Sequence, residues 1–196
     1  MNKILFAATF VLSAIIASAQ TTVGERAQRN AEFKERPVKD RLAYGGDLSL
    51  QFGTYTYINL SPIIGYRLNP DFMMGFGLSY QYLAYRGPGY VNRSHIYGGR
   101  VFARHEIGRS FFAHGEYEIL NLEAYSLATG LGRRNVNMAG LGLGYKSMFG
   151  DFSYYYIMIL YDFIQDPHTP YPLVQNFLYY GQGVPIIIKA GFIFGK

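Results

Sequence analysis

Apolar residues alternate with small or polar residues along most of the chain, beginning at Leu42. In the first such stretch the even positions carry mostly Leu, Tyr and Phe, whereas Ala43, Asp47 and Gln51 stand at odd positions. Successive side chains of a β-strand point to opposite faces, so this period of two predicts a strand with one apolar face.

The alternation recurs to the C-terminal residues and predicts about eight strands. Their predicted ranges are 42–52, 58–68, 74–84, 96–107, 111–120, 138–148, 153–163 and 184–194. After residue 19 the chain has no apolar run of about 18 residues, the length that a membrane-spanning helix needs. Strands of about 10–12 residues instead suit a tilted crossing of the hydrocarbon core.

The predicted connections alternate in length. Tight turns at 69–71, 108–110 and 149–151 lie between longer segments at 86–94, 121–135 and 164–183, and on the long side only the connection near 53–54 is short. Periplasmic turns and longer extracellular loops are typical of bacterial outer-membrane barrels. We therefore predict an all-β fold: a membrane-spanning antiparallel up-and-down β-barrel of about eight strands, formed by residues 42–196.

A soluble β-sandwich or lipocalin-like barrel is the structural alternative, with the apolar face inside. The polar face is too poor in charge for that, since it consists largely of Gly and Ser with a few charges of both signs. Lipid can cover an apolar exterior, whereas water cannot. The pattern therefore favours the membrane barrel.

The residues before the barrel divide into two parts. Residues 1–19 are typical of a cleavable signal peptide: Lys3 precedes an apolar core, and Ala17-Ser18-Ala19 forms a small-residue cleavage pattern. Residues 20–41 include many acidic and many basic residues. They are expected to form a periplasmic segment with a short helix that Pro37 ends. A docking arm for a partner is the alternative for this segment.

Composition supports the barrel and excludes several classes of function. Among 196 residues there are 19 Tyr and no Trp, so any aromatic girdle at the membrane interface must consist of Tyr and Phe. The absence of Cys excludes a disulfide framework and a thiolate metal site. The net charge of +5 comes from scattered residues without a basic run, so we expect no nucleic-acid partner. No metal-ligand spacing is present, and we expect no cofactor.

Charged residues on the polar face are expected to line the lumen as a network. They are Asp47, Arg67, Arg100, Arg104, Glu106, His114, Glu116, Glu118, Lys146, Asp162 and Lys189. A tight turn near residues 108–109 places Arg100 opposite Glu116 or Glu118, and Arg104 near His114 or Glu116. An eight-stranded lumen holds side chains and little else, so a salt-bridged plug is favoured over an ion path, a gate or a carboxylate pair for acid/base catalysis.

The long connections contain further candidates. The predicted surface-loop interaction residues are Arg133, Arg134, Tyr171, Phe177, Tyr179 and Tyr180, and the two arginines are suited to lipopolysaccharide phosphates. Three alternatives stand for the apolar segment 164–183: it folds over the barrel mouth, extends the strands beyond the membrane, or binds a partner. Ser94-His95 and Asp166 with His168 are the residues on which an enzyme would depend. Neighbouring residues of a strand point to opposite faces, so Ser94 and His95 are poorly placed for a shared mechanism. We assign no catalytic residue.

Two segments carry a family resemblance: Gly-Tyr-Arg-Leu-Asn-Pro at 65–70 and Lys-Ala-Gly-Phe-Ile-Phe at 189–194. With the leader and the alternation, they resemble small OmpA/OmpX-like outer-membrane barrels, most closely uncharacterised ones from Bacteroidota. The resemblance spans about residues 41–196, without a diagnostic catalytic motif, and the chain ends in Phe-Gly-Lys rather than in an aromatic residue. It implies a location in a Gram-negative outer membrane and insertion by the barrel-assembly machinery.

The sequence leaves three functional hypotheses. The first is a structural or interaction barrel, which contacts outer-membrane lipid and lipopolysaccharide and presents surface loops or joins a larger outer-membrane complex. The second is an enzyme that modifies lipid A or phospholipid. The third is a narrow, porin-like channel.

Overall fold

The computed structural model describes residues 23–51, 55–87, 90–126, 130–166, 168–171 and 185–195. The chain divides into two compact units, residues 1–37 and 38–196. The predicted signal peptide, residues 1–19, lies outside the described residues. Three of the predicted surface-loop residues, Phe177, Tyr179 and Tyr180, lie outside them as well.

The first unit contains one described helix, α2 (Val23–Glu35). It ends two residues before Pro37, as predicted, because proline disfavours helical geometry in the residue that precedes it. The second unit opens with a short 3₁₀ helix, η1 (Val38–Arg41), which leads directly into the first strand. Within the described ranges, no helix has both the length and the apolar character needed to cross a membrane.

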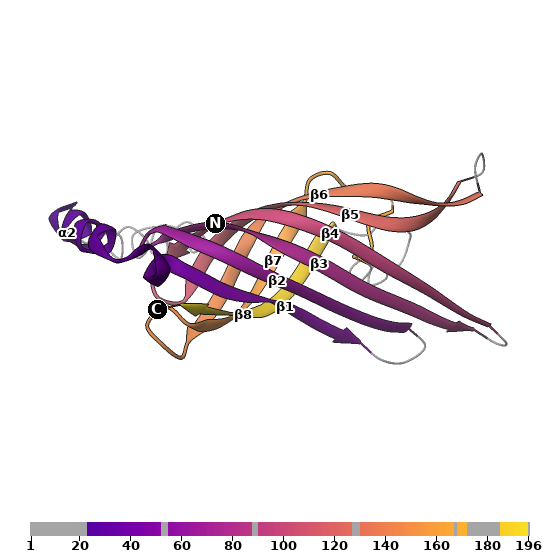
Figure 1. Cartoon of the computed structure of the whole chain (residues 1–196), viewed down its shortest axis with the longest axis horizontal. Helices are drawn as coiled ribbons and strands as arrows, with labels where there is room; N and C mark the ends of the chain where they lie inside the picture. Colours follow the sequence, from indigo (N-terminus) through magenta and orange to yellow (C-terminus); the bar gives the residue numbers. More distant parts are fainter. Residues whose placement is uncertain are drawn as a thin grey trace, which may run out of the picture. The chain divides into compact units, whose positions relative to one another are not determined.

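The second unit is a closed antiparallel barrel of eight strands, which confirms the predicted fold class (Figure 1). The strands are β1 (Leu42–Gln51), β2 (Tyr55–Asn69), β3 (Phe72–Gly87), β4 (Tyr90–Ile107), β5 (Phe111–Ser126), β6 (Gly130–Met148), β7 (Tyr154–Asp162) and β8 (Ile186–Gly195). Each strand pairs with the next, and β8 pairs with β1.

Two pairs of strands are longer than predicted, so most of 86–94 and 121–135 is strand rather than loop. The β3–β4 pairing continues to Gly87 and Tyr90, and the β5–β6 pairing continues to Ser126 and Gly130. Backbone pairing does not require an apolar face, so the ladders extend beyond the point where the hydrophobic alternation fades. Between β4 and β5, pairing reaches only Tyr97 and Asn121, and beyond these residues the two hairpins separate (Figure 1).

The predicted faces of the strands are confirmed. In β7 the side chains alternate strictly between buried and exposed, with Tyr154, Tyr156 and Met158 inside. Ile157 and Ile159 point outward. The barrel thus has an apolar exterior and a lumen that contains both its charged side chains and a set of packed apolar ones.

The seam between the first and last strands has the shortest pairing in the barrel. β1 pairs with β8 at five positions, from Ala43–Gly195 to Asp47–Gly191, although β1 itself continues to Gln51. Pairing between β1 and β2 covers ten positions. Beyond Asp47 and Gly191, the described residues of the two strands have no backbone pairing with each other. Closure of this part of the seam therefore depends on side chains more than on backbone hydrogen bonds.

Candidate functional site

The described lumen contains five cationic side chains and five carboxylates. The cations are Arg67, Arg100, Arg104, Lys146 and Lys189, and the carboxylates are Asp47, Glu106, Glu116, Glu118 and Asp162. Most of them are almost fully buried, and Glu106 is nearly so. A buried charge is tolerated when an opposite charge and hydrogen bonds compensate it, so their partners decide whether this lumen is stable.

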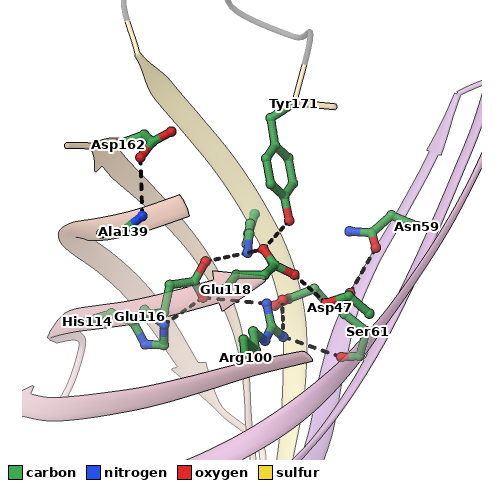
Figure 2. A network of polar contacts seen from close by, with 12 residues as sticks. Asp47, Asn59, Ser61, Arg100, His114, Glu116, Glu118, Ala139, Asp162 and Tyr171 are labelled. Carbon is green, nitrogen blue, oxygen red and sulfur yellow. Dashed lines mark hydrogen bonds and ion pairs between the residues drawn. The ribbon is translucent and has the colours of Figure 1, made fainter. Parts of the chain in front are cut away.

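The central network joins strands from opposite walls of the barrel (Figure 2). Arg100 on β4 forms an ion pair with Asp47 on β1, and its second amino group lies 3.5 Å from Glu116 on β5. Lys189 on β8 binds Glu116 and lies 3.5 Å from Glu118. Asp47 and Lys189 belong to the two strands of the short seam, so this network ties both of them to the far wall of the barrel.

Two hydroxyl groups that the sequence analysis did not single out complete the coordination of the carboxylates. Tyr156 donates a hydrogen bond to Asp47, and Ser79 donates one to Glu118. Both residues occupy inward positions of their strands, so the alternation already placed them in the lumen. Their partners lie on other strands and depend on how the barrel closes.

His114 connects the central network to a more isolated cation. Arg104 donates through Nε to His114 Nδ1 over 3.2 Å, which assigns the ring proton to Nε2, and Nε2 lies 3.1 Å from Glu116. No carboxylate within the described part of the chain lies at ion-pair distance from Arg104. Its guanidinium instead lies 4.3 Å from the ring centroids of both Phe112 and Tyr156. The quadrupoles of these rings compensate part of the charge.

A separate cluster lies near the end with the tight turns. Glu106 accepts a hydrogen bond from Arg67 over 3.0 Å and forms an ion pair with Lys146. The Arg67 guanidinium also lies 4.8 Å from the ring centroid of Phe152. This cluster fills the lumen where β2, β4 and β6 approach their turns.

Asp162 is buried but is not part of the ion-pair network. Its Oδ1 accepts hydrogen bonds from the backbone N–H groups of Ala139 and Ile164, at 3.3 and 3.0 Å. Asp162 is the last residue of β7, and these bonds hold the start of the following segment against β6. Its role in the structure is therefore to fix the end of a strand.

Tyr171 lies in the barrel mouth, which is one of the three alternatives for its segment. Its hydroxyl donates a hydrogen bond to Glu118 and accepts one from Gln81 over 3.2 Å. Lys189 lies 5.1 Å from its ring centroid. Burial and the Glu118 carboxylate raise the pKa of Tyr171 well above its usual value. The segment after β7 thus places a side chain on top of the central network.

Arg133 and Arg134 lie on β6 rather than in a loop, and they face opposite sides of the wall. Arg133 points outward, donates to the backbone oxygens of His95 and Asn121 at 3.0 and 2.9 Å, and pairs with Glu123 at 3.4 Å. It therefore bridges the gap where β4 and β5 separate. Arg134 lies on the other face, 3.9 Å from Asp166.

The histidines considered for catalysis contact residues other than Ser94. His95 Nδ1 lies 3.0 Å from the hydroxyl of Tyr80. His168 has Asp166 at 3.3 Å from Nδ1 and Arg134 at 3.4 Å from Nε2. A general base needs a free ring nitrogen directed at its nucleophile, whereas both ring nitrogens of His168 have a partner. In the described ranges, no three His, Cys, Asp or Glu side chains are grouped so as to hold a metal ion.

Comparison with protein-family models finds no match, and comparison with curated protein sequences finds none. Among solved structures, the chain is similar to the crystal structure of the N-terminal β-barrel domain of Pseudomonas aeruginosa OprF. The similarity has a TM-score of 0.37 and 14% sequence identity, and it covers 79% of this chain and 95% of that domain.

Proposed function

We propose that this chain is an outer-membrane β-barrel with a structural or interaction role, whose lumen is closed by its own side chains. The observation that supports this most strongly is the distribution of polarity. Phe76, Leu78 and Leu143 are exposed on the outer wall at 57%, 65% and 63%, whereas ten charged side chains occupy the interior. An exterior this rich in apolar side chains is stable in lipid and unfavourable in water.

The height of the apolar band fits a bilayer. On β4 the outward face runs from Tyr97 to Ile107, and at the register of these two residues β5 carries Asn121 and Phe111. Ten residue steps of about 3.4 Å, tilted by about 40°, span about 25 Å, which matches the apolar band of outer-membrane barrels. Aromatic side chains mark both edges, with Tyr97 at one and Phe111 at the other.

The closed lumen favours a structural or interaction role over a channel. Glu116 contacts both Arg100 and Lys189 across the interior, and Tyr171 covers Glu118. An ion that crossed this region would have to separate several buried ion pairs, each with a desolvation cost of several kcal/mol. Planar-bilayer recordings of the purified barrel are therefore expected to show no discrete conductance, and regular open-channel steps would contradict the closed lumen.

Membrane location can be tested with one substitution and a matched control. Leu143→Arg places a charge on the apolar band and is expected to destabilise the barrel in phospholipid vesicles by about 2–4 kcal/mol. Arg109 lies in the tight turn after β4, and Arg109→Leu should change stability by no more than about 0.5 kcal/mol. A protein that stays monomeric in buffer without detergent, and tolerates Leu143→Arg there, would contradict the proposal.

A further inference from the structure

A hollow of about 490 Å³ lies on the outer wall of the barrel, over β3, β4 and β5. Its apolar sides are formed by Phe76, Val101, Tyr117 and Ile119, which all point away from the lumen. The hollow exists because Gly99 occupies an outward position between these larger side chains. A Cβ added at Gly99 would meet only the Gly77 carbonyl oxygen, at 3.6 Å, so the space in front of it is open.

Polar groups gather at one end of this hollow, where β4 and β5 separate. Tyr97 and Asn121 line that end, and the Arg133 guanidinium lies 5.3 Å from the Tyr97 ring centroid. Hydrogen bonds to Asn121 and to the His95 carbonyl hold this guanidinium in place, and its side chain remains 38% exposed. An immobilised cation therefore stands directly above an apolar groove.

The charge on this part of the outer wall is positive overall. Glu123 lies 3.4 Å from Arg133 and compensates part of its charge. Farther along the same face, Arg86 and Arg93 line a second hollow of about 260 Å³ together with Tyr82. Among the described residues of β3 to β6 beyond Tyr97, the outward face thus carries three arginines, Arg86, Arg93 and Arg133, and one carboxylate, Glu123.

We propose that this groove binds an acyl lipid with an anionic phosphate headgroup, in the leaflet nearest the β3–β4 and β5–β6 hairpins. One acyl chain lies in the hollow in front of Gly99, and the phosphate lies beside Arg133, within reach of Arg93. The proposal rests on the proposed membrane location, because only a lipid-embedded wall would present this groove to acyl chains. It goes further in assigning a defined site to one stretch of that wall.

The test fills the groove without disturbing its neighbours. Gly99→Leu places a side chain in the hollow. Gly115→Leu is the matched control, since Gly115 is also outward and a Cβ there also meets its nearest atom at 3.6 Å, but Gly115 is not among the residues that line the hollow. Native mass spectrometry of the detergent-solubilised full chain measures how much dimyristoyl phosphatidylglycerol stays bound. Loss of contact with about two methylene groups weakens binding roughly tenfold, which is the effect expected for Gly99→Leu alone. If Gly99→Leu retains as much lipid as the wild type, or if both variants lose equal amounts, lipid binding in this groove is contradicted.

The headgroup is tested separately with Arg133→Gln, Arg93→Gln and two further lipids. Arg133→Gln should weaken phosphatidylglycerol binding at least fivefold while leaving the binding of dimyristoylglycerol, which has the same acyl chains and no phosphate, unchanged, and Arg93→Gln should have a smaller effect in the same direction. Arg93→Gln keeps the test valid if Arg133→Gln fails to fold. Equal affinity for both lipids in the wild type would overturn the phosphate contact. Hexa-acyl lipid A, tested in parallel, shows whether the preferred source of the phosphate is a glycolipid or a phospholipid.

Failure of this site is distinguishable from failure of the membrane location. If the barrel folds into vesicles but Gly99→Leu retains lipid as the wild type does, only the lipid site is wrong. If the wild type neither needs detergent nor inserts into vesicles, the proposed function itself is wrong.

Discussion

Glu116→Gln removes the carboxylate at the centre of the lumen network and leaves its partners in place. In the wild type, Glu116 forms an ion pair with Lys189, lies 3.5 Å from Arg100, and is 3.1 Å from the Nε2 of His114. Glutamine has nearly the same shape, so the substitution changes the charge and little else. The lumen would then hold five cations and four carboxylates among the described residues.

The expected cost follows from the burial of these partners. Lys189 is 2% exposed and Arg100 is 5% exposed, so neither can recover hydration when its carboxylate is lost. Breaking a buried ion pair by removing one partner costs about 3–5 kcal/mol. With a urea slope of about 2 kcal/mol/M, the unfolding midpoint should fall by about 1.5–2.5 M.

Glu123→Gln is the matched control, because it makes the same change on the same strand outside the barrel. Glu123 pairs with Arg133 at 3.4 Å, with both side chains more than a third exposed, so its loss should cost less than about 1 kcal/mol. The chain has no Trp, so far-UV circular dichroism in vesicles or the electrophoretic shift of the folded barrel must follow unfolding.

A double substitution separates charge balance from packing. Glu116→Gln combined with Lys189→Met removes one charge of each sign and should recover much of the stability that Glu116→Gln loses. If Glu116→Gln and Glu123→Gln shift the urea midpoint equally, or if the double variant is no more stable than Glu116→Gln, the interlocked lumen is not what stabilises this barrel.

Three further predictions concern the mouth, the wall and the seam. The raised pKa of Tyr171 means that folding favours the protonated phenol, so the wild type loses stability once the pH is high enough to deprotonate the phenol of the unfolded chain. The difference in stability between the wild type and Tyr171→Phe should therefore begin to shrink as the pH rises past about 10. Urea titrations at several pH values measure this difference. At Gly142 a Cβ would overlap the backbone of β7, so Gly142→Ala should cost about 1–3 kcal/mol. Gly115→Ala, whose Cβ would meet its nearest atoms in ordinary contact at 3.6 and 3.9 Å, should unfold as the wild type does. Asp47→Asn should speed amide hydrogen exchange in β8 along the seam, whereas Glu106→Gln, in the separate cluster, should not; equal exchange in both variants would contradict the role of the central network in closure.

The sequence predicts the faces of the strands well because one physical rule acts on every residue of the wall. A side chain either meets the surroundings of the barrel or enters a narrow lumen, and a strand alternates between the two. Local register follows from the tight turn as well: Arg100 lies opposite Glu118, and Arg104 lies opposite His114, as expected. Contacts between neighbouring strands joined by a short turn are therefore within reach of sequence reasoning.

Sequence reasoning does not predict the ends of the strands or the contacts across the lumen. Hydrophobic alternation reports where a wall is apolar, whereas backbone pairing continues into the polar hairpins, so Arg133 was expected in a loop and lies on β6. The ion pair between Asp47 and Arg100 depends on how far the strands are staggered when the barrel closes, and no local pattern encodes this stagger. The segment that contains Tyr171 had three alternatives for a related reason: a loop rich in apolar residues gives no sign of which one enters the lumen.

The balance of charge inside the barrel bears on where its function lies. Arg100 and Lys189 each contact carboxylates on other strands, and Glu118 accepts hydrogen bonds from Ser79 and Tyr171. Side chains held in this way cannot rearrange around a substrate without exposing several buried charges at once, and each would cost several kcal/mol. The outer wall lacks this constraint, since its hollows are open and its arginines are partly exposed. We infer that recognition by this chain takes place on the outside of the barrel, where a ligand can be added without breaking the ion pairs in the lumen.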